Sequence, residues 1–325
     1  MLRIAVIGAS GKVGREVIKI LNEKGLIAGS EIDLFASQRS EGIKICDGDF
    51  CFVIKKLCKE NIDKKYDYAL FCAGGKVSKE FACEFIKNGA VVIDNSSVFR
   101  RESDVPLVVP EINFDHIKKD CKLIANPNCS TIGCALVLNS LLKLYDIKRV
   151  VASTYQAVSG AGQKGIDDLN NNTTNKFVYP INNNLIPCID YPLENGYTFE
   201  EDKMNFELNK ILNRQIKIST TCVRVPVLNC HSESLNIQFD RAPTLEKIKE
   251  VLKSEKGVCL VDDLKNNQYP MPILADGKDD VFVGRIRKDP SNTRAINLFL
   301  SFDNIRKGAS LNAVQILERL IKERG

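Results

Sequence analysis

The turn after the first apolar segment constrains the fold more than any other feature of this sequence. Residues 2–8 form an apolar, largely β-branched run that ends in glycine, which is typical of a buried parallel strand. Gly11 and Gly14 follow at three-residue intervals, and an apolar helical face then extends to Gly25. Glycine permits a tight turn, and the unpaired N–H groups of a helix start can bind a pyrophosphate. We therefore expect a strand–turn–helix phosphate cradle, although an incidental glycine turn would give the same spacing.

Apolar segments that alternate with helical ones continue through the first 130 residues. We expect strands at Ile32–Ala36, Tyr66–Cys72, Ala90–Asp94, Val105–Val109 and Leu123–Ala125, with a helix at Phe81–Lys87. This alternation predicts an α/β domain with a doubly wound parallel sheet of the Rossmann type.

The pattern changes after residue 130. A long apolar helix is expected at Thr131–Leu144, followed by strands at Arg149–Val158, Ile216–Val227 and Leu235–Phe239. We interpret this part as an α+β catalytic and dimerisation domain with a large mixed sheet. The amphipathic helix Ser310–Lys322 is expected to pack back on the first domain. The predicted domains are residues 1–128 with 305–325, and residues 129–304.

Charge and hydropathy exclude several classes of protein. Lys and Arg total 46 and Asp and Glu total 41, and the net charge of +5 favours anionic ligands without indicating nucleic-acid binding. No apolar run reaches the roughly 18 residues of a membrane span. The chain starts with a strand-like run, so we expect no signal peptide and a cytoplasmic protein.

The twelve cysteines include no C-x-x-C pair, and the chain has two histidines. We therefore expect neither a metal site nor a disulfide framework, and most of these thiols should be small buried hydrophobic groups.

The end of the second strand indicates the cofactor. An NAD site needs a carboxylate there for the ribose 2′-hydroxyl, and Asp33 lies too early in the strand. The chain continues instead through Ser37 to Arg39 and Ser40, whose guanidinium and hydroxyl groups suit a 2′-phosphate. This favours NADP over NAD. The alternative is that Arg39 is a solvated loop residue.

Cys129 is the candidate nucleophile. It stands in Asn-Pro-Asn-Cys-Ser-Thr, immediately before the long apolar helix. A helix N-terminus favours a thiolate, and its free N–H groups can stabilise the oxyanion that forms when the sulfur attacks a carbonyl.

A cysteine nucleophile commonly works with a histidine. His116 lies in a polar helical stretch and is interpreted as a surface residue, whereas His231 follows a strand-like segment in Cys-His-Ser-Glu. We predict that His231 is the partner of Cys129, with a purely structural histidine as the alternative.

Several motifs together resemble the aspartate-β-semialdehyde dehydrogenase family. They are the glycine turn, Ala-Ser-x-Arg-Ser at residues 36–40, Asp-Asn-Ser-Ser-x-x-Arg at 94–100, Asn-Pro-Asn-Cys-Ser-Thr at 126–131, Tyr-Gln-Ala-Val-Ser-Gly-Ala-Gly at 155–162, Arg-Val-Pro-Val at 224–227, His-Ser-Glu at 231–233 and Val-Gly-Arg-Ile-Arg-Lys-Asp at 283–289. They keep their order over essentially the whole chain.

The resemblance implies an NADPH-dependent enzyme that converts L-4-aspartyl phosphate to L-aspartate 4-semialdehyde and phosphate. It implies a thioester on Cys129 with His231 as acid/base, and a homodimer or tetramer formed through the second domain's sheet.

The resemblance also implies roles for residues around the nucleophile. Gln156 would orient the substrate, Arg224 would bind its carboxylate, and Glu200 would hold the substrate ammonium or a lysine. The remaining implied substrate contacts are Asn128, Arg100 and Lys203, the last two for the phosphate. The implied NADP contacts are Gly8, Ser10, Gly11, Lys12, Val13, Ser37, Arg39, Ser40, Ser159, Gly160 and Asn304.

One departure and two alternatives remain. The residue before the histidine is Cys230 where this family usually has glycine, which would strain a backbone with positive φ. N-acetyl-γ-glutamyl-phosphate reductase shares the acyl-phosphate chemistry, but it usually has Pro-Gly-Cys-Tyr around its nucleophile. A non-catalytic NADP-binding relative is the second alternative.

Overall fold

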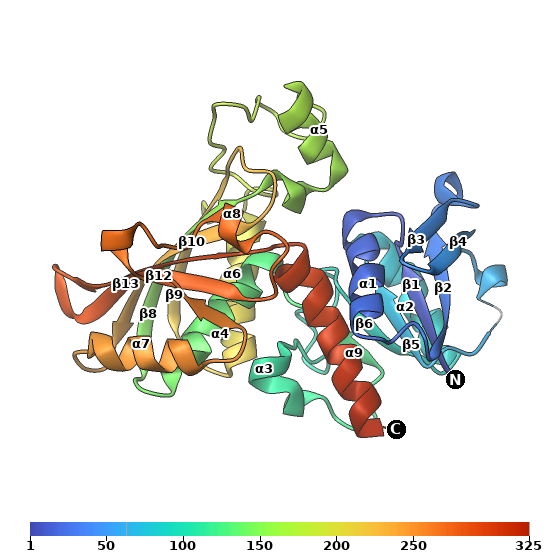
Figure 1. Ribbon diagram of the computed structural model, residues 1–325, viewed down its shortest axis with the longest axis horizontal. Coiled ribbons are helices and arrows are strands. Elements are labelled where there is room, and N and C mark those ends of the chain that lie inside the picture. The colour runs from blue at the N-terminus through green and yellow to red at the C-terminus, as the bar shows by residue number, and fades with distance from the viewer. Residues whose placement is uncertain (63, 325) are drawn as a thin grey trace. The chain divides into compact units, whose positions relative to one another are not determined.

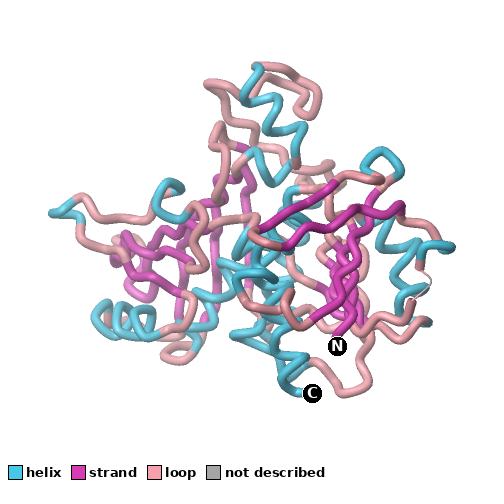
Figure 2. The backbone as a smooth tube through the Cα atoms, turned by 45° about the vertical axis from the view of Figure 1, so that its right-hand side comes forward, coloured by secondary structure: helices cyan, strands magenta, loops and turns pink. Residues whose placement is uncertain are grey.

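The computed structural model describes residues 1–62 and 64–324, and they form two compact units. Unit 1 comprises Met1–Pro127 together with the chain from Ala309 onward, and unit 2 comprises Asn128–Gly308. The strands gather into two separate sheets, one in each unit (Figure 2).

Unit 1 is built on a seven-stranded sheet in the order β3-β4-β2-β1-β5-β6-β7. Its pairs are parallel except for the β3–β4 hairpin. The strands are β1 (Leu2–Ile7), β2 (Ser30–Ala36), β3 (Lys44–Asp47), β4 (Phe50–Lys56), β5 (Tyr68–Phe71), β6 (Val91–Asp94) and β7 (Leu123–Ala125). Strand order reverses direction at β1, so the expected doubly wound sheet is confirmed.

Helices cover both faces of this sheet because its central strands are apolar on both sides. Ile4 and Val6 of β1 pack with α1 and α9, whereas Ala5 and Ile7 pack with α2. The helical elements of unit 1 are α1 (Lys12–Glu23), α2 (Gly75–Lys87), α3 (Pro110–Asn113) and α9 (Leu311–Arg324), with short 3₁₀ turns η1 (Gln38–Ser40), η2 (Lys59–Asn61) and η3 (Phe114–His116). The C-terminal helix therefore belongs to the core of unit 1.

Two expectations for unit 1 are wrong. Residues 105–109 form no strand, only an isolated bridge between Leu107 and Ala125, since Pro106 has no N–H to donate and Pro110 starts α3. The chain also forms a disulfide between Cys46 and Cys51. The β3–β4 hairpin, which the sequence analysis missed, places these two cysteines directly opposite each other.

Unit 2 is built on a six-stranded mixed sheet in the order β11-β12-β13-β10-β8-β9. The β8–β9 and β11–β12 pairs are parallel and the others antiparallel, which confirms the expected mixed sheet. The strands are β8 (Ile147–Gln156), β9 (Lys217–Arg224), β10 (His231–Phe239), β11 (Val258–Leu260), β12 (Val281–Asp289) and β13 (Asn292–Phe302).

The helical elements of unit 2 are α4 (Cys129–Leu142), α5 (Gln163–Asn171), α6 (Phe199–Leu212), α7 (Leu245–Ser254) and α8 (Pro272–Ala275), with η4 (Val158–Ala161), η5 (Leu264–Asn266) and the π-helical turn η6 (Arg306–Ser310) at its end. Helix α4 is apolar on all sides and almost wholly buried, as a core helix should be. Gly133 lets it approach the sheet closely, because a Cβ there would lie 2.4 Å from the Phe302 ring.

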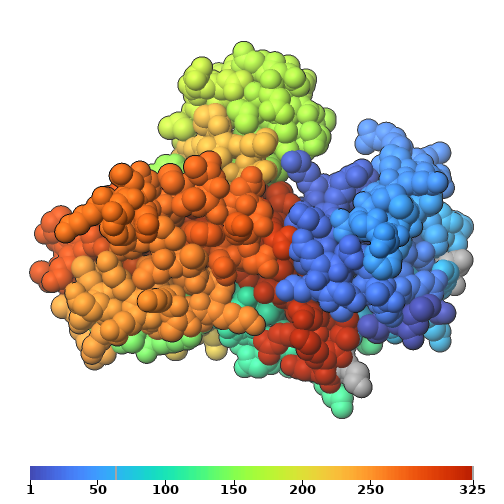
Figure 3. All heavy atoms as spheres, in the orientation of Figure 1, coloured from blue at the N-terminus to red at the C-terminus, as the bar shows by residue number. Residues whose placement is uncertain are grey.

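The segment around α5 stands away from the sheet of unit 2 (Figure 1) and forms a lobe in the space-filling view (Figure 3). The buried carboxylate of Asp168 organises the loop that follows this helix. It accepts hydrogen bonds from the Thr173 hydroxyl and from the backbone N–H groups of Asn175, Lys176 and Phe177. The loop at residues 172–177, which includes Asn172 and Asn175, is therefore held by hydrogen bonds to a buried carboxylate.

Candidate active site

Four neighbouring strands of unit 2 present one row of buried side chains. Gln156 of β8 lies beside Arg224 of β9, and His231 of β10 lies beside Phe302 of β13. The pairing of Ser232 with Tyr155 places His231 next to Gln156 in the same row. Side chains directly opposite on adjacent strands share a face, so three predicted site residues converge here.

Cys129 reaches this row from the start of α4. The Asn128 side chain caps the helix by accepting a hydrogen bond from the Ser130 N–H at 2.8 Å. The Cys129 sulfur then lies 3.2 Å from His231 Nε2. A Cβ on Gly308 would lie 3.1 Å from the Cys129 Cβ, so glycine is needed for close packing there. The predicted nucleophile and histidine are therefore in direct contact.

The His231 imidazole is completely buried and held on several sides. The Ala157 backbone N–H donates to Nδ1 at 3.1 Å, and the Phe302 ring lies edge-on with centroids 6.3 Å apart. A Cβ on Gly160 would lie 3.1 Å from His231 Cε1. Burial, helped by the Arg224 charge and opposed by Glu200, lowers the pKa of His231 to about 3. The ring is therefore neutral at physiological pH.

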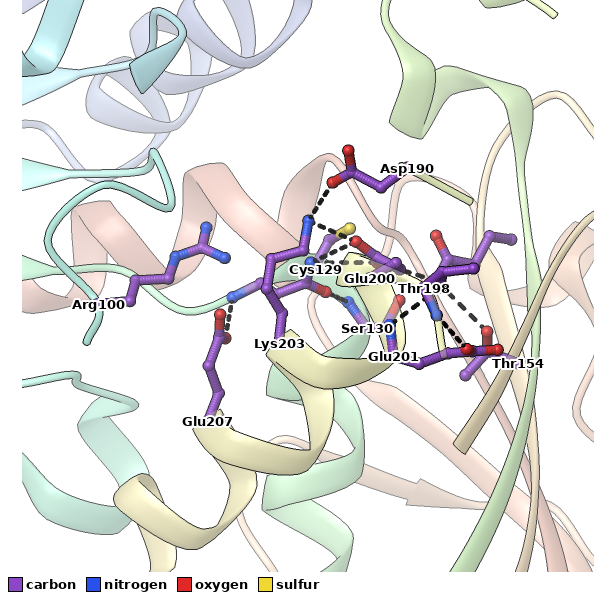
Figure 4. A network of polar contacts seen from close by, with 12 residues as sticks. Arg100, Cys129, Ser130, Thr154, Asp190, Thr198, Glu200, Glu201, Lys203 and Glu207 are labelled. Atoms are coloured by element: carbon purple, nitrogen blue, oxygen red, sulfur yellow. Dashed lines mark hydrogen bonds and ion pairs between the residues drawn. The ribbon is translucent and has the colours of Figure 1, made fainter. Parts of the chain in front are cut away.

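Glu200 of α6 is the centre of the polar network in Figure 4. It accepts hydrogen bonds from the side-chain amides of Asn128 and Gln156, each at 3.1 Å, and pairs with Lys203 at 2.7 Å. Burial alone would raise the pKa of Glu200, but Lys203 and the two amides lower it to about 2. Lys203 also contacts Asp190 at 3.0 Å. Of the two partners foreseen for Glu200, the structure shows the lysine.

Glu207 is a site residue that the sequence analysis missed. It is one heptad after Glu200 on α6, is buried, and accepts a hydrogen bond from the Asn128 backbone N–H at 2.7 Å (Figure 4). The spacing of Glu200, Lys203 and Glu207 puts all three on one helical face, which could have been noticed in the sequence.

Arg224 carries a buried charge suited to an anionic ligand. One guanidinium nitrogen donates to the Ala157 carbonyl at 2.6 Å, whereas the buried Nε has no hydrogen-bond partner. Burial lowers the pKa of Arg224, and the Glu200 and Cys129 charges oppose that shift. A carboxylate that bound here would supply the missing acceptor.

A second buried row lies behind the first on the same strands. It contains Cys222, Thr154, Glu233 and Leu300, each two residues along its strand from a member of the first row. Gln156 donates to the Thr154 hydroxyl at 3.3 Å and so joins the rows. Burial raises the pKa of the Glu233 carboxyl well above its usual value, and a hydrogen bond with the Cys134 side chain opposes that shift.

Cys230 has a φ of 73°, so the strained backbone considered in the sequence analysis is present. Its N–H donates to the Asn304 side chain, which also exchanges hydrogen bonds with Ser159. The Cys230 sulfur lies near the carboxylates of Asp276 and Asp303, with ligand atoms within 4.8 Å of one another. Both Asp303 oxygens accept hydrogen bonds from backbone N–H groups.

The phosphate cradle lies between β1 and α1 of unit 1. Gly8 has a φ of 83°, and a Cβ on Gly14 would lie 2.4 Å from the Gly8 carbonyl oxygen. Gly11 caps α1 without any side-chain hydrogen bond, so no side chain covers the first N–H groups of the helix. Ser10, Lys12 and Val13 belong to the same turn. This arrangement fits a bound pyrophosphate.

The residues predicted for the 2′-phosphate lie in and next to η1. Ser37 and Arg39 are exposed, and Ser40 ends the turn. Asp33 is buried, accepts a hydrogen bond from the Tyr66 hydroxyl at 2.8 Å and pairs with Lys55 at 2.6 Å. Its carboxylate is therefore engaged within the sheet, which agrees with its exclusion as a ribose ligand.

The structure thus gathers seven of the predicted catalytic and substrate-binding residues within unit 2. They are Asn128, Cys129, Gln156, Glu200, Lys203, Arg224 and His231. Arg100 belongs to unit 1, where it is buried and donates to the Asn95 carbonyl at 2.8 Å.

Comparisons with known proteins agree with this site. Residues 3–120 match a family model described as semialdehyde dehydrogenase, NAD binding domain, and residues 138–307 match semialdehyde dehydrogenase, dimerisation domain. The aspartate-semialdehyde dehydrogenase of Aquifex aeolicus is 49% identical over 99% of this chain and 98% of its own length. This chain belongs to the aspartate-semialdehyde dehydrogenase family.

Solved structures of the family extend the comparison. Aspartate semialdehyde dehydrogenase II from Vibrio cholerae, complexed with ASA, has a TM-score of 0.94 and 38% identity over 99% of this chain and 98% of its own. The Candida albicans enzyme, solved with NADP, has a TM-score of 0.78 and 26% identity, and the match covers 98% of each chain. These names favour the family interpretation over the N-acetyl-γ-glutamyl-phosphate reductase alternative.

Proposed function

We propose that the protein reduces L-4-aspartyl phosphate to L-aspartate 4-semialdehyde and phosphate with NADPH, in the aspartate pathway to lysine and diaminopimelate, threonine, methionine and isoleucine. The observation that carries this proposal is the 3.2 Å contact between the Cys129 sulfur and His231 Nε2 at the start of α4. A nucleophile at a helix N-terminus, beside an imidazole, is suited to acyl transfer through a thioester.

The reaction starts with attack of the Cys129 sulfur on the acyl-phosphate carbonyl. A carbon–sulfur bond forms, and the carbon–oxygen bond to phosphate breaks with its electron pair on the phosphate. NADPH, when bound, supplies the hydride that reduces the thioester. The resulting alkoxide re-forms a carbonyl and expels the Cys129 thiolate, which releases the semialdehyde and restores the nucleophile.

The surrounding residues bind and orient the substrate in this proposal. Arg224 binds its carboxylate, which the unpartnered Nε supports. Gln156 lies beside Cys129's histidine in the same row and orients the reacting group. Glu200 is proposed to receive the ammonium, and Lys203, which pairs with Glu200 at 2.7 Å, is proposed to meet the phosphate. Asn128 holds Glu200 in place. Arg100 is proposed as a further phosphate ligand because the family resemblance implies it.

The glycine turn and the segment after β2 carry most of the proposed cofactor contacts. The uncapped start of α1 and the absence of Cβ atoms at Gly8 and Gly14 fit the pyrophosphate, and Arg39 fits a 2′-phosphate. The remaining proposed contacts are Ser10, Gly11, Lys12, Val13, Ser37, Ser40, Ser159, Gly160 and Asn304.

We also propose a cytoplasmic homodimer that pairs through the sheet of unit 2. The matched dimerisation-domain family supports the dimer, and the partly exposed Tyr155, whose ring lies 6.1 Å from that of Phe299, offers an aromatic surface. Ten of the twelve cysteines are free, which favours a reducing compartment, whereas Cys46 and Cys51 are bonded to each other. No helix in the described residues is long and apolar enough to cross a membrane. Sedimentation analysis distinguishes dimer from tetramer.

The reverse reaction provides the test. Purified protein mixed with aspartate semialdehyde, phosphate and NADP⁺ should produce NADPH, and omission of phosphate should stop it. Cys129→Ala should abolish turnover while NADP binding persists. A flat absorbance trace with the unmodified protein would favour the non-catalytic alternative, and turnover by Cys129→Ala would remove the sulfur from the mechanism.

A further inference from the structure

Asn128, the residue before the nucleophile, is held by helix α6 at two points. Its backbone N–H donates to the Glu207 carboxylate at 2.7 Å, and its side-chain amide donates to both oxygens of Glu200 at 3.1 Å. Its side-chain oxygen caps α4 through the Ser130 N–H. Cys129 is the next residue, so the position of its sulfur depends on how Asn128 is held.

The acceptor for the Asn128 N–H comes from α6 and not from α4 itself. In a capping box this donor is bound by a Glu or Gln three residues later, as Glu201 does for Thr198 at the start of α6. In α4 that position is Thr131, whose buried hydroxyl has no hydrogen-bond partner in the described part of the chain. Glu207 therefore supplies from another helix an acceptor that a capping box would have supplied locally.

The two carboxylates of α6 differ in the partners that they keep. Glu200 also binds Gln156 and Lys203, and in the proposed function it receives the substrate ammonium. A substrate that binds Glu200 therefore competes with the side-chain contacts of the free protein. Glu207 is 1% exposed and binds a backbone N–H, which a change of side-chain rotamer does not move. The Glu207 contact can therefore stay in place while Glu200 exchanges partners.

We propose that Glu207 is a positioning residue for the reaction, and that it fixes the start of α4 by accepting the Asn128 N–H. The inference rests on the proposed function, since it concerns the placement of the Cys129 sulfur for attack on the acyl carbon. The 2.7 Å distance is typical of a hydrogen bond to a charged carboxylate. Attack requires the reacting atoms to approach in one direction at about 3–3.5 Å, so release of Asn128 should slow bond formation more than it weakens substrate binding.

Two substitutions separate the reach of this side chain from its charge. Glu207→Gln keeps the length and a side-chain oxygen but loses the charge, whereas Glu207→Asp keeps the charge and is shorter by one methylene. If Glu207 acts as an acceptor, Glu207→Asp should lower kcat about 30-fold, since a misplacement of about 1 Å can cost about 100-fold. Glu207→Gln should keep kcat within about threefold of the parent value, because a neutral oxygen still binds the N–H. KM should stay within about twofold in both variants, as expected for an effect on the transition state.

Glu201→Asp is the matched control on the same helix. Glu201 is also a buried carboxylate that accepts a backbone N–H from another element, that of Cys222 at 2.9 Å. Both aspartate variants should lose a similar free energy of unfolding in urea, but Glu201→Asp should keep kcat close to that of the parent protein. Equal losses of kcat at the two positions would reduce Glu207 to a structural residue. A larger loss in Glu207→Gln than in Glu207→Asp would show that its charge acts, and either result would overturn the proposal.

Hydrogen exchange gives a readout that needs no turnover. Mass spectrometry of a peptide that contains residues 128–130 reports on the amides at the start of α4. We expect exchange there to be about tenfold faster in Glu207→Asp, as loss of one hydrogen bond to a charged group predicts, and unchanged in Glu201→Asp. If the parent protein fails to convert aspartate semialdehyde, the proposed reaction is wrong, and the exchange rates still test whether Glu207 holds Asn128. Exchange as slow as in the parent protein, or an unchanged kcat, in Glu207→Asp would overturn the inference.

Discussion

Two helix starts in this chain use the same N-terminal dipole for different purposes. Helix α1 follows Gly11 and has no side-chain cap, so its N–H groups remain open to a ligand's phosphate. Helix α4 follows Asn128, whose side chain caps the helix while Glu207 binds its backbone N–H. The first start is a binding surface made of backbone. The second is a closed support that positions one sulfur, Cys129.

The largest expected effect tests the start of α1, where backbone N–H groups form the binding surface. In Gly14→Ala the new Cβ would lie 2.4 Å from the Gly8 oxygen and 2.7 Å from the Ala9 Cα, and neither backbone atom can move aside easily. We expect a loss of about 3 kcal/mol in the unfolding free energy of unit 1, measured in urea, and weaker NADP binding.

Gly29→Ala is the matched control for that change, since a Cβ at Gly29 would meet nothing within 4 Å. If the two variants were equally stable and bound NADP equally well, the turn would not depend on glycine.

The activity of the site around Cys129, which is formed by side chains, should also depend on a glycine. In Gly160→Ala the added Cβ lies 3.1 Å from both Arg224 Nη1 and His231 Cε1. Displacing these groups by a fraction of an ångström should reduce kcat/KM about 100-fold in the steady-state assay. Gly29→Ala serves as the reference variant. If Gly160→Ala had the same kcat/KM as this reference, the buried row that contains Arg224 and His231 would tolerate the added methyl group.

The second row should respond to pH because Glu233 is buried and protonated. Its pKa is raised above that of the unfolded chain, so the folded state binds one more proton and stability falls as pH rises above about 4.5. Glu233→Gln lacks this penalty. Its stability relative to the parent protein should increase by about 1.4 kcal/mol per pH unit until the folded-state pKa is passed.

Thermal unfolding from acid to neutral pH measures this difference, and the exposed-site variant Glu194→Gln controls for the loss of one negative charge. A difference between Glu233→Gln and the parent that stays constant with pH would indicate that Glu233 is ionised in the folded protein.

The smallest effect concerns Cys230. Cys230→Ala keeps a β-carbon at a φ of 73°, whereas Cys230→Gly removes it. We expect the glycine variant to be more stable than the alanine variant by about 1 kcal/mol in urea unfolding, despite the greater flexibility of its unfolded chain. Equal stability, or the reverse order, would show that the left-handed backbone is unstrained here.

Local sequence patterns predicted much of the fold. The glycine turn, α4 and the alternating strands were recognisable because each depends on neighbouring residues along the chain. The prediction of a strand at Val105–Val109 was wrong. It relied on the apolar residues of this segment and overlooked Pro106 and Pro110, which do not fit a continuous strand. The β3–β4 hairpin and its Cys46–Cys51 disulfide were missed because β3 has only four residues and the apolar run at residues 50–54 of β4 was not interpreted as a strand.

The candidate site was less predictable from local sequence than the fold was. Cys129 and His231 could be chosen because few residues of their types had suitable neighbours. The spacing of Glu207 from Glu200 placed it on the same helical face, but its partner Asn128 is 79 positions away and could not be predicted. The Ala157 N–H gave no signal at all, since its partner His231 is 74 positions away. The second buried row behind the site could not be predicted either, because strand pairing brings its members together from distant parts of the sequence.

The sequence by itself determined which residue types stand at helix starts and strand ends, since those follow from spacing and side-chain chemistry over a few positions. Only the tertiary structure decided which nitrogen of His231 faces the sulfur, because that depends on a backbone N–H brought to the ring by the pairing of β8 with β10. Such a contact joins residues 74 positions apart in the sequence, so residue identity could not supply it, and here it orients the ring.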